Sequence, residues 1–280
     1  MLNTIEQMQD LPAEISVSVQ TDVGCVRNSN EDAGCFLMPS DPIILATKGR
    51  LFLVADGMGG HSGGEVASAL AVETISRAYY GDSEAPAESL RSAFEEANRC
   101  IYDESIADER LSGMGTTCTA LVLHRNSAIA AHVGDSRLYL LREGELYLLT
   151  EDHSAVMEMV KLGIISVEQA RHHEDKNVIV RALGTSPLVE VSLWENPMAV
   201  RTGDRFLLCS DGLYDLVEDE AIRDLVLSSP DTHSACENLI DLAKEKGGFD
   251  NITVALVSIR PAGYIETRKL RATREAEVVL

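Results

Sequence analysis

Apolar positions along the chain follow two different periods. Short apolar or alternating runs, typical of strands, lie at residues 15–20, 51–55, 117–123, 128–133, 137–141, 205–209 and 252–259. Longer segments, with apolar residues recurring every three or four positions, predict amphipathic helices at residues 65–80, 86–103, 218–229 and 233–246. The chain is therefore expected to contain both kinds of element in comparable amounts.

The order of these elements predicts the fold class. Residues 137–149 are typical of a hairpin that turns at Glu143 and Gly144, and the other strands also come in runs. The two long helices are consecutive, so the regular strand–helix alternation of a parallel sheet is missing. We expect an α+β architecture of antiparallel sheets covered by helix pairs.

The pattern divides the chain into a main domain and three further segments. Residues 152–190 hold two short helical pieces and little strand signal, which predicts an insertion, or flap, over a scaffold. We expect the catalytic domain at 13–260, an N-terminal extension at 1–12 and a basic tail at 261–280. The tail is interpreted either as a solvated terminus or as an autoinhibitory or docking segment.

Charge and cysteine usage narrow the class of protein. The 280 residues carry 24 Lys and Arg against 45 Asp and Glu, a formal charge of −21, so nucleic acid and anionic membrane surfaces are poor partners. The first residues lack the basic and apolar regions of a secretory signal. The six cysteines are scattered without CxxC spacing, as expected for small buried side chains in a reducing compartment. A cytoplasmic location is predicted.

Several acidic residues share a context that surface carboxylates usually lack. Asp56, Asp135, Asp211 and Asp250 each lie at a strand end or in a tight loop beside Gly, Ser or Asn. A single such Asp is usually a turn residue, but several in one chain favour a shared site. Converging carboxylates need a counter-charge, and oxygen-only ligands select Mg²⁺ or Mn²⁺. Two such ions can activate a water for attack on an electrophile.

Eight short motifs occur in an order that resembles a known family. They are RNSNED (27–32), VADGMGGH (54–61), MGTT (114–117), GDSR (134–137), TEDHS (150–154), RALG (181–184), CSDGL (209–213) and DNIT (250–253). Over roughly residues 13–260 the chain is similar to the metal-dependent protein phosphatases (PPM, type 2C Ser/Thr phosphatases), especially the bacterial branch. The resemblance implies a four-layer α-β-β-α sandwich of two mainly antiparallel sheets flanked by helix pairs.

The resemblance also implies roles for individual residues. Asp56 is expected to bridge two metal ions, and a third, weaker ion is expected at Asp135 and Asp211. The other implied ligands are Glu31, Gly57 through its carbonyl oxygen, Asp211 and Asp250. Around them Asp32 and Asn251 are expected to support the ligands, whereas Asp215 is either such a support or a helix cap.

Phosphate binding and proton transfer are assigned less directly. Arg27 resembles the phosphate-binding arginine, although alone it would be interpreted as a surface ion pair. Animal members have a His directly after the Asp-Gly pair, but Met58 stands there in this chain. His61 is therefore the candidate general acid, with metal-bound water as the alternative. His153 is expected to be structural.

Together with these residues, the resemblance implies hydrolysis of phosphoserine and phosphothreonine in proteins by a water activated between two Mn²⁺ or Mg²⁺ ions. The expected partners are phosphoproteins, including a Ser/Thr protein kinase and its substrates, and the chain is expected to be a monomer. Two alternatives stay open at this point. One is a catalytically weak, phosphatase-like binding module, and the other is a hydrolase of small phosphoesters.

Overall fold

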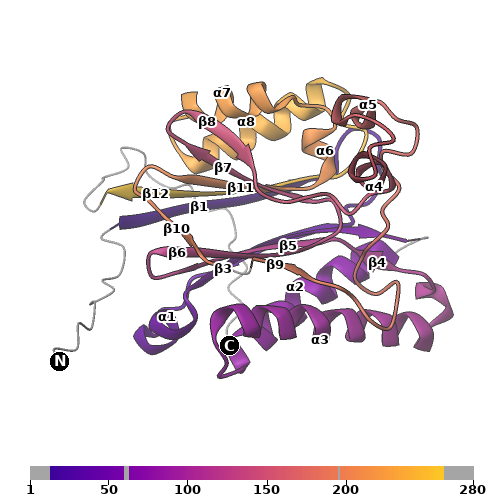
Figure 1. Ribbon diagram of the computed structural model, residues 1–280, viewed down its shortest axis with the longest axis horizontal. Coiled ribbons are helices and arrows are strands. Elements are labelled where there is room, and N and C mark those ends of the chain that lie inside the picture. The colour runs from indigo at the N-terminus through magenta and orange to yellow at the C-terminus, as the bar shows by residue number, and fades with distance from the viewer. Residues whose placement is uncertain (1–12, 60–62, 195, 262–280) are drawn as a thin grey trace.

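The computed structural model describes residues 13–59, 63–194 and 196–261. Within these ranges, a pair of sheets packs face to face between two layers of helices (Figure 1). On one outer side lie α2 (Gly63–Gly81) and α3 (Pro86–Ala107), and on the other lie α7 (Asp219–Ser228) and α8 (Thr232–Glu245). This arrangement confirms the predicted α+β class and the four-layer sandwich.

All the strand pairings described in the two sheets are antiparallel. The first sheet has the order β1 (Ala13–Asp22), β12 (Ile252–Pro261), β11 (Arg205–Cys209), β7 (Arg137–Arg142) and β8 (Glu145–Leu148). The second has the order β10 (Met198–Ala199), β6 (Ser127–Val133), β5 (Cys118–His124), β3 (Arg50–Met58) and β2 (Asp32–Leu37). Two short strands extend it, β4 (Gly115–Thr116) beside β3 and β9 (Ser192–Leu193) beside β6.

Strand β3 is apolar on both faces because each face is covered. Leu51 and Leu53 pack with the α2–α3 layer, while Phe52 and Val54 lie between the two sheets. Successive side chains of a strand point to opposite faces, so a strand buried on both sides has no polar alternation. The continuous apolar run at 51–55 follows from this position in the sandwich.

The predicted helices and the hairpin form where the sequence indicates. Pro86 starts α3 at a position where its missing N–H has no helical partner to lose. The Asp231 side chain accepts a hydrogen bond from the Ser234 N–H (2.7 Å) and caps α8. Glu143 and Gly144 both have positive φ (56° and 87°), the geometry of a tight turn between β7 and β8.

Several features of the secondary structure differ from the sequence prediction. Strand β2 and the short helix α1 (Pro42–Lys48) were not expected, nor was the 3₁₀ turn η1 (Glu109–Leu111). Strand β3 does not end before Asp56 but continues to Met58, because its last residues pair with β4. Asp56 therefore lies within a paired strand rather than after one.

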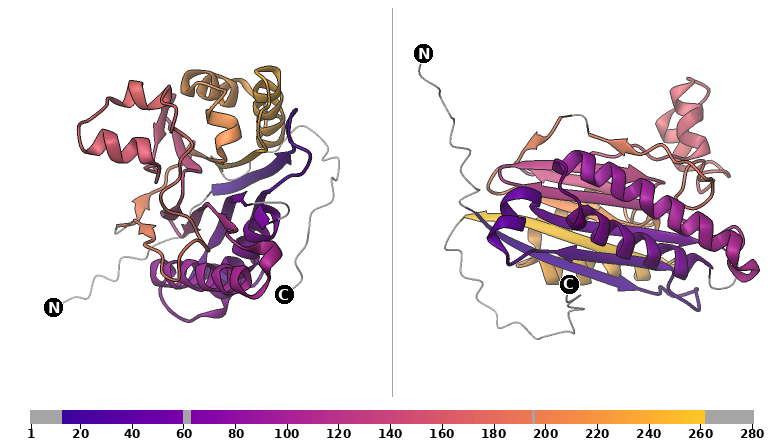
Figure 2. Two further views of the ribbon diagram at one scale, coloured as in Figure 1. Left: turned by 90° about the vertical axis from the view of Figure 1, so that its right-hand side faces the viewer. Right: turned by 90° about the horizontal axis from the view of Figure 1, so that it is seen from below.

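The flap, residues 152–190, holds two short helices as expected, α4 (Ala155–Lys161) and α5 (Val167–Arg171). In Figure 2 these two helices stand to one side of the sheets. Both helices begin at a serine whose hydroxyl accepts a backbone N–H: Ser154 from Met157 and Ser166 from Gln169. The flap thus has defined local structure.

The six cysteines are all free, and Cys118, Cys209 and Cys236 are buried as predicted. Cys25 is exposed, contrary to that expectation, because its loop runs over the surface. In the described ranges no helix has both the length and the apolar composition to cross a membrane. The predicted N-terminal extension and basic tail lie almost entirely outside the described residues.

Candidate metal centre

Six segments bring the predicted site residues to one end of the sandwich, where α6 (Asp211–Tyr214) and β4 lie (Figure 1). The residues and their positions are Arg27 and Glu31 between β1 and β2, Asp32 at the start of β2, Asp56 and Gly57 in β3, Asp135 between β6 and β7, Asp211 at the start of α6, and Asp250 and Asn251 before β12. Both sheets therefore contribute to the site.

Strand register places two carboxylates opposite each other. Asp32 and Asp56 are direct partners in the β2–β3 ladder. Asp32 also accepts a hydrogen bond from the Ser210 hydroxyl (2.7 Å), and the Ser210 hydroxyl accepts one from the Thr253 N–H (2.9 Å). Through Ser210 the second sheet is joined to the first at the level of these two carboxylates.

The Glu31 loop is held by backbone contacts rather than by its carboxylate. The Asn251 side chain accepts a hydrogen bond from the Glu31 N–H (2.8 Å) and donates to the carbonyl oxygens of Val23 and Ser29 (3.0 Å each). A Cβ at Gly64 would lie 2.5 Å from the Glu31 carboxylate and 2.9 Å from the backbone carbonyl carbon of Gly57, so a side chain there would require the backbone to shift. These contacts direct the Glu31 side chain to the start of α2.

Gly57 lies where three segments approach closely. Its N–H donates to the Glu31 carbonyl (3.1 Å), and a Cβ at Gly57 would be 2.1 Å from the Gly64 carbonyl oxygen. Asp56, directly before it, has its backbone fixed by Thr117, whose hydroxyl accepts the Asp56 N–H (3.0 Å). The Thr116 hydroxyl donates to the Asp56 carbonyl (2.8 Å). The predicted bridging carboxylate therefore extends from a rigid backbone.

The carboxylates lie close enough to shift one another's protonation. Burial raises the pKa of Asp56 and of Asp211 well above the usual range, and the neighbouring carboxylates raise each further. Burial likewise raises the pKa of Asp32 to about 6 and that of Asp135 to about 7. The pKa of Glu31 is also raised by burial. Buried carboxylates that repel one another in this way favour either protonation or a bound cation.

Arg27 is the one predicted site residue of positive charge. Its Nη2 donates to Asp250 Oδ2 (2.7 Å), and both side chains are partly exposed (51% and 35%). The hydrogen bond to Asp250 raises the pKa of Arg27 further above its usual value. The guanidinium thus lies at the exposed edge of the carboxylate cluster.

The chemistry of the donor set fits a hard divalent cation. Oδ1 of Asp32 and Oδ1 of Asp211 are buried and have no hydrogen-bond partner within the described ranges. A buried carboxylate oxygen without a partner is unfavourable, and a cation would satisfy it. The residues gathered here offer only oxygen donors, as Mg²⁺ and Mn²⁺ prefer.

No three His, Cys, Asp or Glu side chains of the described residues form a ready ligand set for a single ion. The predicted ligands do not require one, because ions of this type retain several waters and take only one or two carboxylates each. The cluster brings together the predicted ligands, and their assignment to particular ions stays a prediction.

Other predicted residues have mixed outcomes. Asp215 follows the last residue of α6 and pairs with Lys176 of the flap (2.7 Å). His153 is buried, and its side chain accepts the Gly134 N–H (3.0 Å), which agrees with a structural role. His61 lies outside the described residues.

Three residues that hold the site were not predicted from the sequence: Ser210, Thr116 and Thr117. They stand within the motifs CSDGL and MGTT, beside or among the residues that were singled out. The residue that a hydroxyl contacts in another part of the fold cannot be recognised from its neighbours in the sequence. The contacts of these three residues therefore could not be predicted.

Comparison with known proteins gives consistent matches over most of the chain. Residues 43–238 match the family model described as "Protein phosphatase 2C". The chain is 41% identical over 247 residues to the "Serine/threonine phosphatase stp" of Listeria welshimeri, an alignment that covers 85% of this chain and 93% of that protein.

Solved structures agree. A crystal structure of the Mycobacterium tuberculosis serine/threonine phosphatase PstP/Ppp superimposes with a TM-score of 0.77 at 37% identity, covering 88% of this chain and 99% of that one. A structure of the catalytic domain of PstP in complex with two manganese ions matches with a TM-score of 0.73 at 35% identity, over 88% and 98% of the two chains.

Proposed function

The chain belongs to the protein phosphatase 2C family, and from that premise we propose how its own residues hydrolyse phosphoserine and phosphothreonine in proteins. The enzyme is a metal-dependent serine/threonine protein phosphatase. Its fold supports the activity by bringing residues from both sheets to one edge.

The observation that carries the proposal is the convergence of Asp32, Asp56, Asp135 and Asp211. Each has a raised pKa because burial and neighbouring carboxylates oppose its ionisation. Such a cluster is unfavourable for folding alone, so it is expected where a cation binds. Clusters of strongly perturbed groups are also typical of active sites.

We assign the metal ligands from the family motifs, and their convergence at one end of the sandwich supports the assignment. Asp56, the Gly57 carbonyl oxygen, Glu31, Asp211 and Asp250 would hold a pair of divalent ions, and Asp135 with Asp211 would hold a weaker third ion. When bound, a pair of Mn²⁺ or Mg²⁺ ions lowers the pKa of a water and stabilises charge on the phosphoryl group. Asp32 and Asn251 orient the ligands, supported by their contacts to Ser210 and to the Glu31 N–H.

Arg27 is proposed to bind the phosphoryl oxygens of the substrate. Its ion pair with Asp250 uses one of the five guanidinium N–H groups and holds the side chain at the edge of the cluster. A planar guanidinium can then donate two parallel hydrogen bonds to a phosphoryl group. The proton that the departing serine or threonine oxygen needs is proposed to come from one of two sources, His61 or metal-bound water.

The proposal extends to partners and location. Ser/Thr-phosphorylated proteins, among them a Ser/Thr protein kinase and its substrates, are the proposed partners, and the enzyme is proposed to act as a monomer. A cytoplasmic location is supported by six free cysteines, three of them buried. The excess of acidic residues argues against nucleic acid and anionic membranes as partners.

The test is the release of inorganic phosphate from a phosphothreonine peptide, measured with Mn²⁺, with Mg²⁺ and with excess EDTA. We expect release with either metal, none with EDTA, and recovery when Mn²⁺ is restored. The Asp56→Ala variant should be inactive while keeping the circular dichroism spectrum of the wild type. Activity that persists in excess chelator would contradict the metal-based proposal.

The same assay with a nucleotide and with an aryl phosphate separates the two alternatives. A small-phosphoester hydrolase would turn over the nucleotide with a kcat/KM equal to or above that of the peptide. A binding module would bind the phosphopeptide but release no phosphate. We expect the phosphopeptide to be the preferred substrate.

A further inference from the structure

Two buried Arg–Asp pairs lie at opposite ends of strand β7. Arg137, its first residue, pairs with Asp152, and Arg142, its last, pairs with Asp204. Both contacts are bidentate through Nε and Nη2, with closest distances of 2.7 Å, and the arginine side chains are equally exposed (17% and 18%). The two pairs are therefore alike in geometry and in the exposure of their arginine side chains but differ in what surrounds them.

Arg142 and Asp204 lie at the end of β7 that carries none of the proposed site residues. Arg142 Nη2 also donates to the Ala199 carbonyl (2.9 Å), and Asp204 accepts the Arg201 N–H (2.7 Å). These partners hold β7 to β10 and to the turn before β11. The pair stabilises the sheet and has no proposed ligand among its described contacts.

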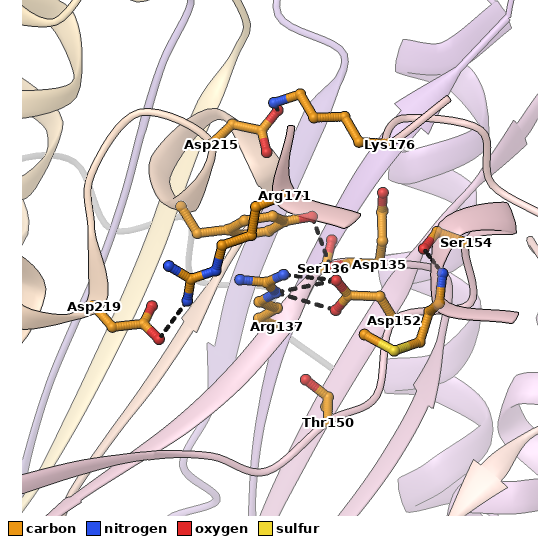
Figure 3. A network of polar contacts seen from close by, with 12 residues as sticks. Asp135, Ser136, Arg137, Thr150, Asp152, Ser154, Arg171, Lys176, Asp215 and Asp219 are labelled. Atoms are coloured by element: carbon orange, nitrogen blue, oxygen red, sulfur yellow. Dashed lines mark hydrogen bonds and ion pairs between the residues drawn. The ribbon is translucent and has the colours of Figure 1, made fainter. Parts of the chain in front are cut away.

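Arg137 lies among segments that carry proposed ligands, as Figure 3 shows. Its guanidinium stacks on the Tyr214 ring (3.7 Å to the centroid), and the Tyr214 hydroxyl donates to the Asp135 carbonyl (3.1 Å). Tyr214 ends α6, the helix that begins with Asp211. The Arg137 guanidinium, through Tyr214, thus connects the Asp135 loop with the helix that carries Asp211.

Asp152, with which Arg137 pairs, is the first residue of the flap. The next residue, His153, donates its N–H to the Gly134 carbonyl (2.8 Å), and its side chain accepts the Gly134 N–H (3.0 Å). The Thr150 hydroxyl accepts the Leu138 N–H (3.1 Å). The start of the flap and the loop of Asp135 are therefore joined at several points, with the Arg137–Asp152 pair at the centre.

The far side of the flap contacts the same helical region through exposed ion pairs. Lys176 pairs with Asp215 (2.7 Å), and Arg171 pairs with Glu218 (3.0 Å). Exposed pairs of this kind contribute little and weaken with salt. The buried pair at Arg137 is the contact expected to fix the geometry, because its donors and acceptors are largely removed from water.

We propose that Arg137, Asp152 and Tyr214 are positioning residues that hold Asp135 beside Asp211 and fix the start of the flap. The inference rests on the proposed function, in which Asp135 and Asp211 bind the weaker divalent ion. Groups that orient metal ligands typically change affinity or activity about 10- to 100-fold when they are removed. Losing the pair should therefore weaken Mn²⁺ binding at that position and raise KM for the phosphopeptide.

The matched pair provides the control. Arg137→Lys and Asp152→Asn are compared with Arg142→Lys and Asp204→Asn in full-length protein, each checked by circular dichroism and Tm. Mn²⁺ binding is measured by isothermal titration calorimetry, and kcat and KM are measured with a phosphothreonine peptide at several Mn²⁺ concentrations. All four variants are expected to lower Tm, because each breaks a buried pair.

Only the Arg137 and Asp152 variants are expected to weaken the lower-affinity Mn²⁺ binding step, by about tenfold or more, and to raise KM. Tyr214→Phe keeps the ring beneath the guanidinium and removes only the hydroxyl. It should fold normally and weaken the same step by a few-fold, so the proposal can be tested even if the charge variants do not fold.

Two results would overturn the inference. If the variants at both ends of β7 lowered Tm alike and left Mn²⁺ binding and KM at wild-type values, the Arg137 pair would be purely structural. If the wild type itself neither bound Mn²⁺ nor released phosphate, the proposed function would fall together with the inference. The wild-type measurement therefore distinguishes the two failures.

Discussion

Strand β3 belongs to two regions of the molecule with opposite effects on folding: an apolar interior that favours it and a carboxylate cluster that opposes it. Between residues 51 and 55 its side chains fill two apolar clusters, and Phe52 and Val54 are completely buried between the sheets. At Asp56 the same strand enters a cluster of carboxylates whose raised pKa values reflect burial and mutual repulsion. Burial of apolar surface favours folding, whereas burial of like charges opposes it. Burial of apolar side chains in the interior therefore offsets the unfavourable free energy of the carboxylate cluster.

The interior is expected to show the largest effect on stability. Phe206 lies between the sheets with no exposed surface, so Phe206→Ala should lower the free energy of unfolding by about 3–5 kcal/mol. Urea unfolding in EDTA measures this. The kcat of the folded fraction should change little, and a loss of kcat comparable to that of a ligand variant would show that the two regions are not separable.

A substitution at the carboxylate end should have the opposite effects: it should lower activity strongly without lowering the free energy of unfolding. Asp211→Asn removes a proposed ligand and a repelling charge, so phosphopeptide turnover should fall by about 10²- to 10³-fold, which is the range seen when one group that stabilises transition-state charge is lost. The free energy of unfolding in EDTA should not fall. Steady-state kinetics with saturating Mn²⁺ measure the first effect. Turnover within twofold of wild type would exclude Asp211 as a ligand.

Arg27 lies between these extremes, because it touches the cluster but is half exposed. Arg27→Ala should raise KM for a phosphopeptide by about tenfold, while Arg27→Lys restores only a fraction of the loss, since an ammonium cannot make the bidentate contact. Arg77, an exposed arginine that pairs with Glu96 (2.7 Å) on the α2–α3 layer, is the matched control. An equal effect of Arg77→Ala would contradict the assignment.

The fourth prediction concerns pH and is the smallest effect. Asp32 and Asp135 have folded-state pKa values of about 6 and about 7, against about 3.9 in an unfolded chain. Between these values the unfolded chain is ionised while the folded chain keeps its protons. The metal-free protein should therefore lose stability as pH rises from about 4 to about 7.

Two buried histidines act in the opposite direction. Burial lowers the pKa of His132 to about 4 and that of His153 to about 3, so their contribution to stability falls as pH drops below about 6.5. The two histidines contribute equally with and without metal. Their contribution therefore cancels when the Tm in EDTA is subtracted from the Tm in Mn²⁺. Differential scanning fluorimetry should show this difference growing by several degrees from pH 5.5 to pH 7.5. A constant difference would contradict the pKa assignments.

The comparison also explains which elements could be predicted from the sequence. Runs such as residues 51–55 and the long amphipathic helices α2 and α3 were predicted because burial repeats with the period of the element. Strand β2 was missed because Gly34 interrupts it. A Cβ there would lie 2.9 Å from a Val19 side-chain carbon, so the residue is fixed by the neighbouring sheet and not by local propensity.

The same limit applies to the site. Asp211 and Asp250 could be predicted because each stands beside the end of a strand, and Asp56 because it follows a buried apolar run, although β3 continues past it. Ser210, which joins Asp32 to the other sheet, could not, since residues 32 and 210 meet only in the folded chain. The Arg137–Asp152 pair was hidden for the same reason. The motifs identify the proposed ligands, and the tertiary contacts identify the residues that hold them in place.

The most direct test of this account is the order of thermal stability of the wild type and Asp56→Asn in two buffers at pH 7.5. In EDTA the variant lacks one repelling charge and should unfold at a higher temperature than the wild type. In saturating Mn²⁺ the wild type should gain the binding free energy and unfold at the higher temperature. If the variant were less stable than the wild type in both buffers, Asp56 would be a structural residue and the carboxylate cluster would not be a metal centre.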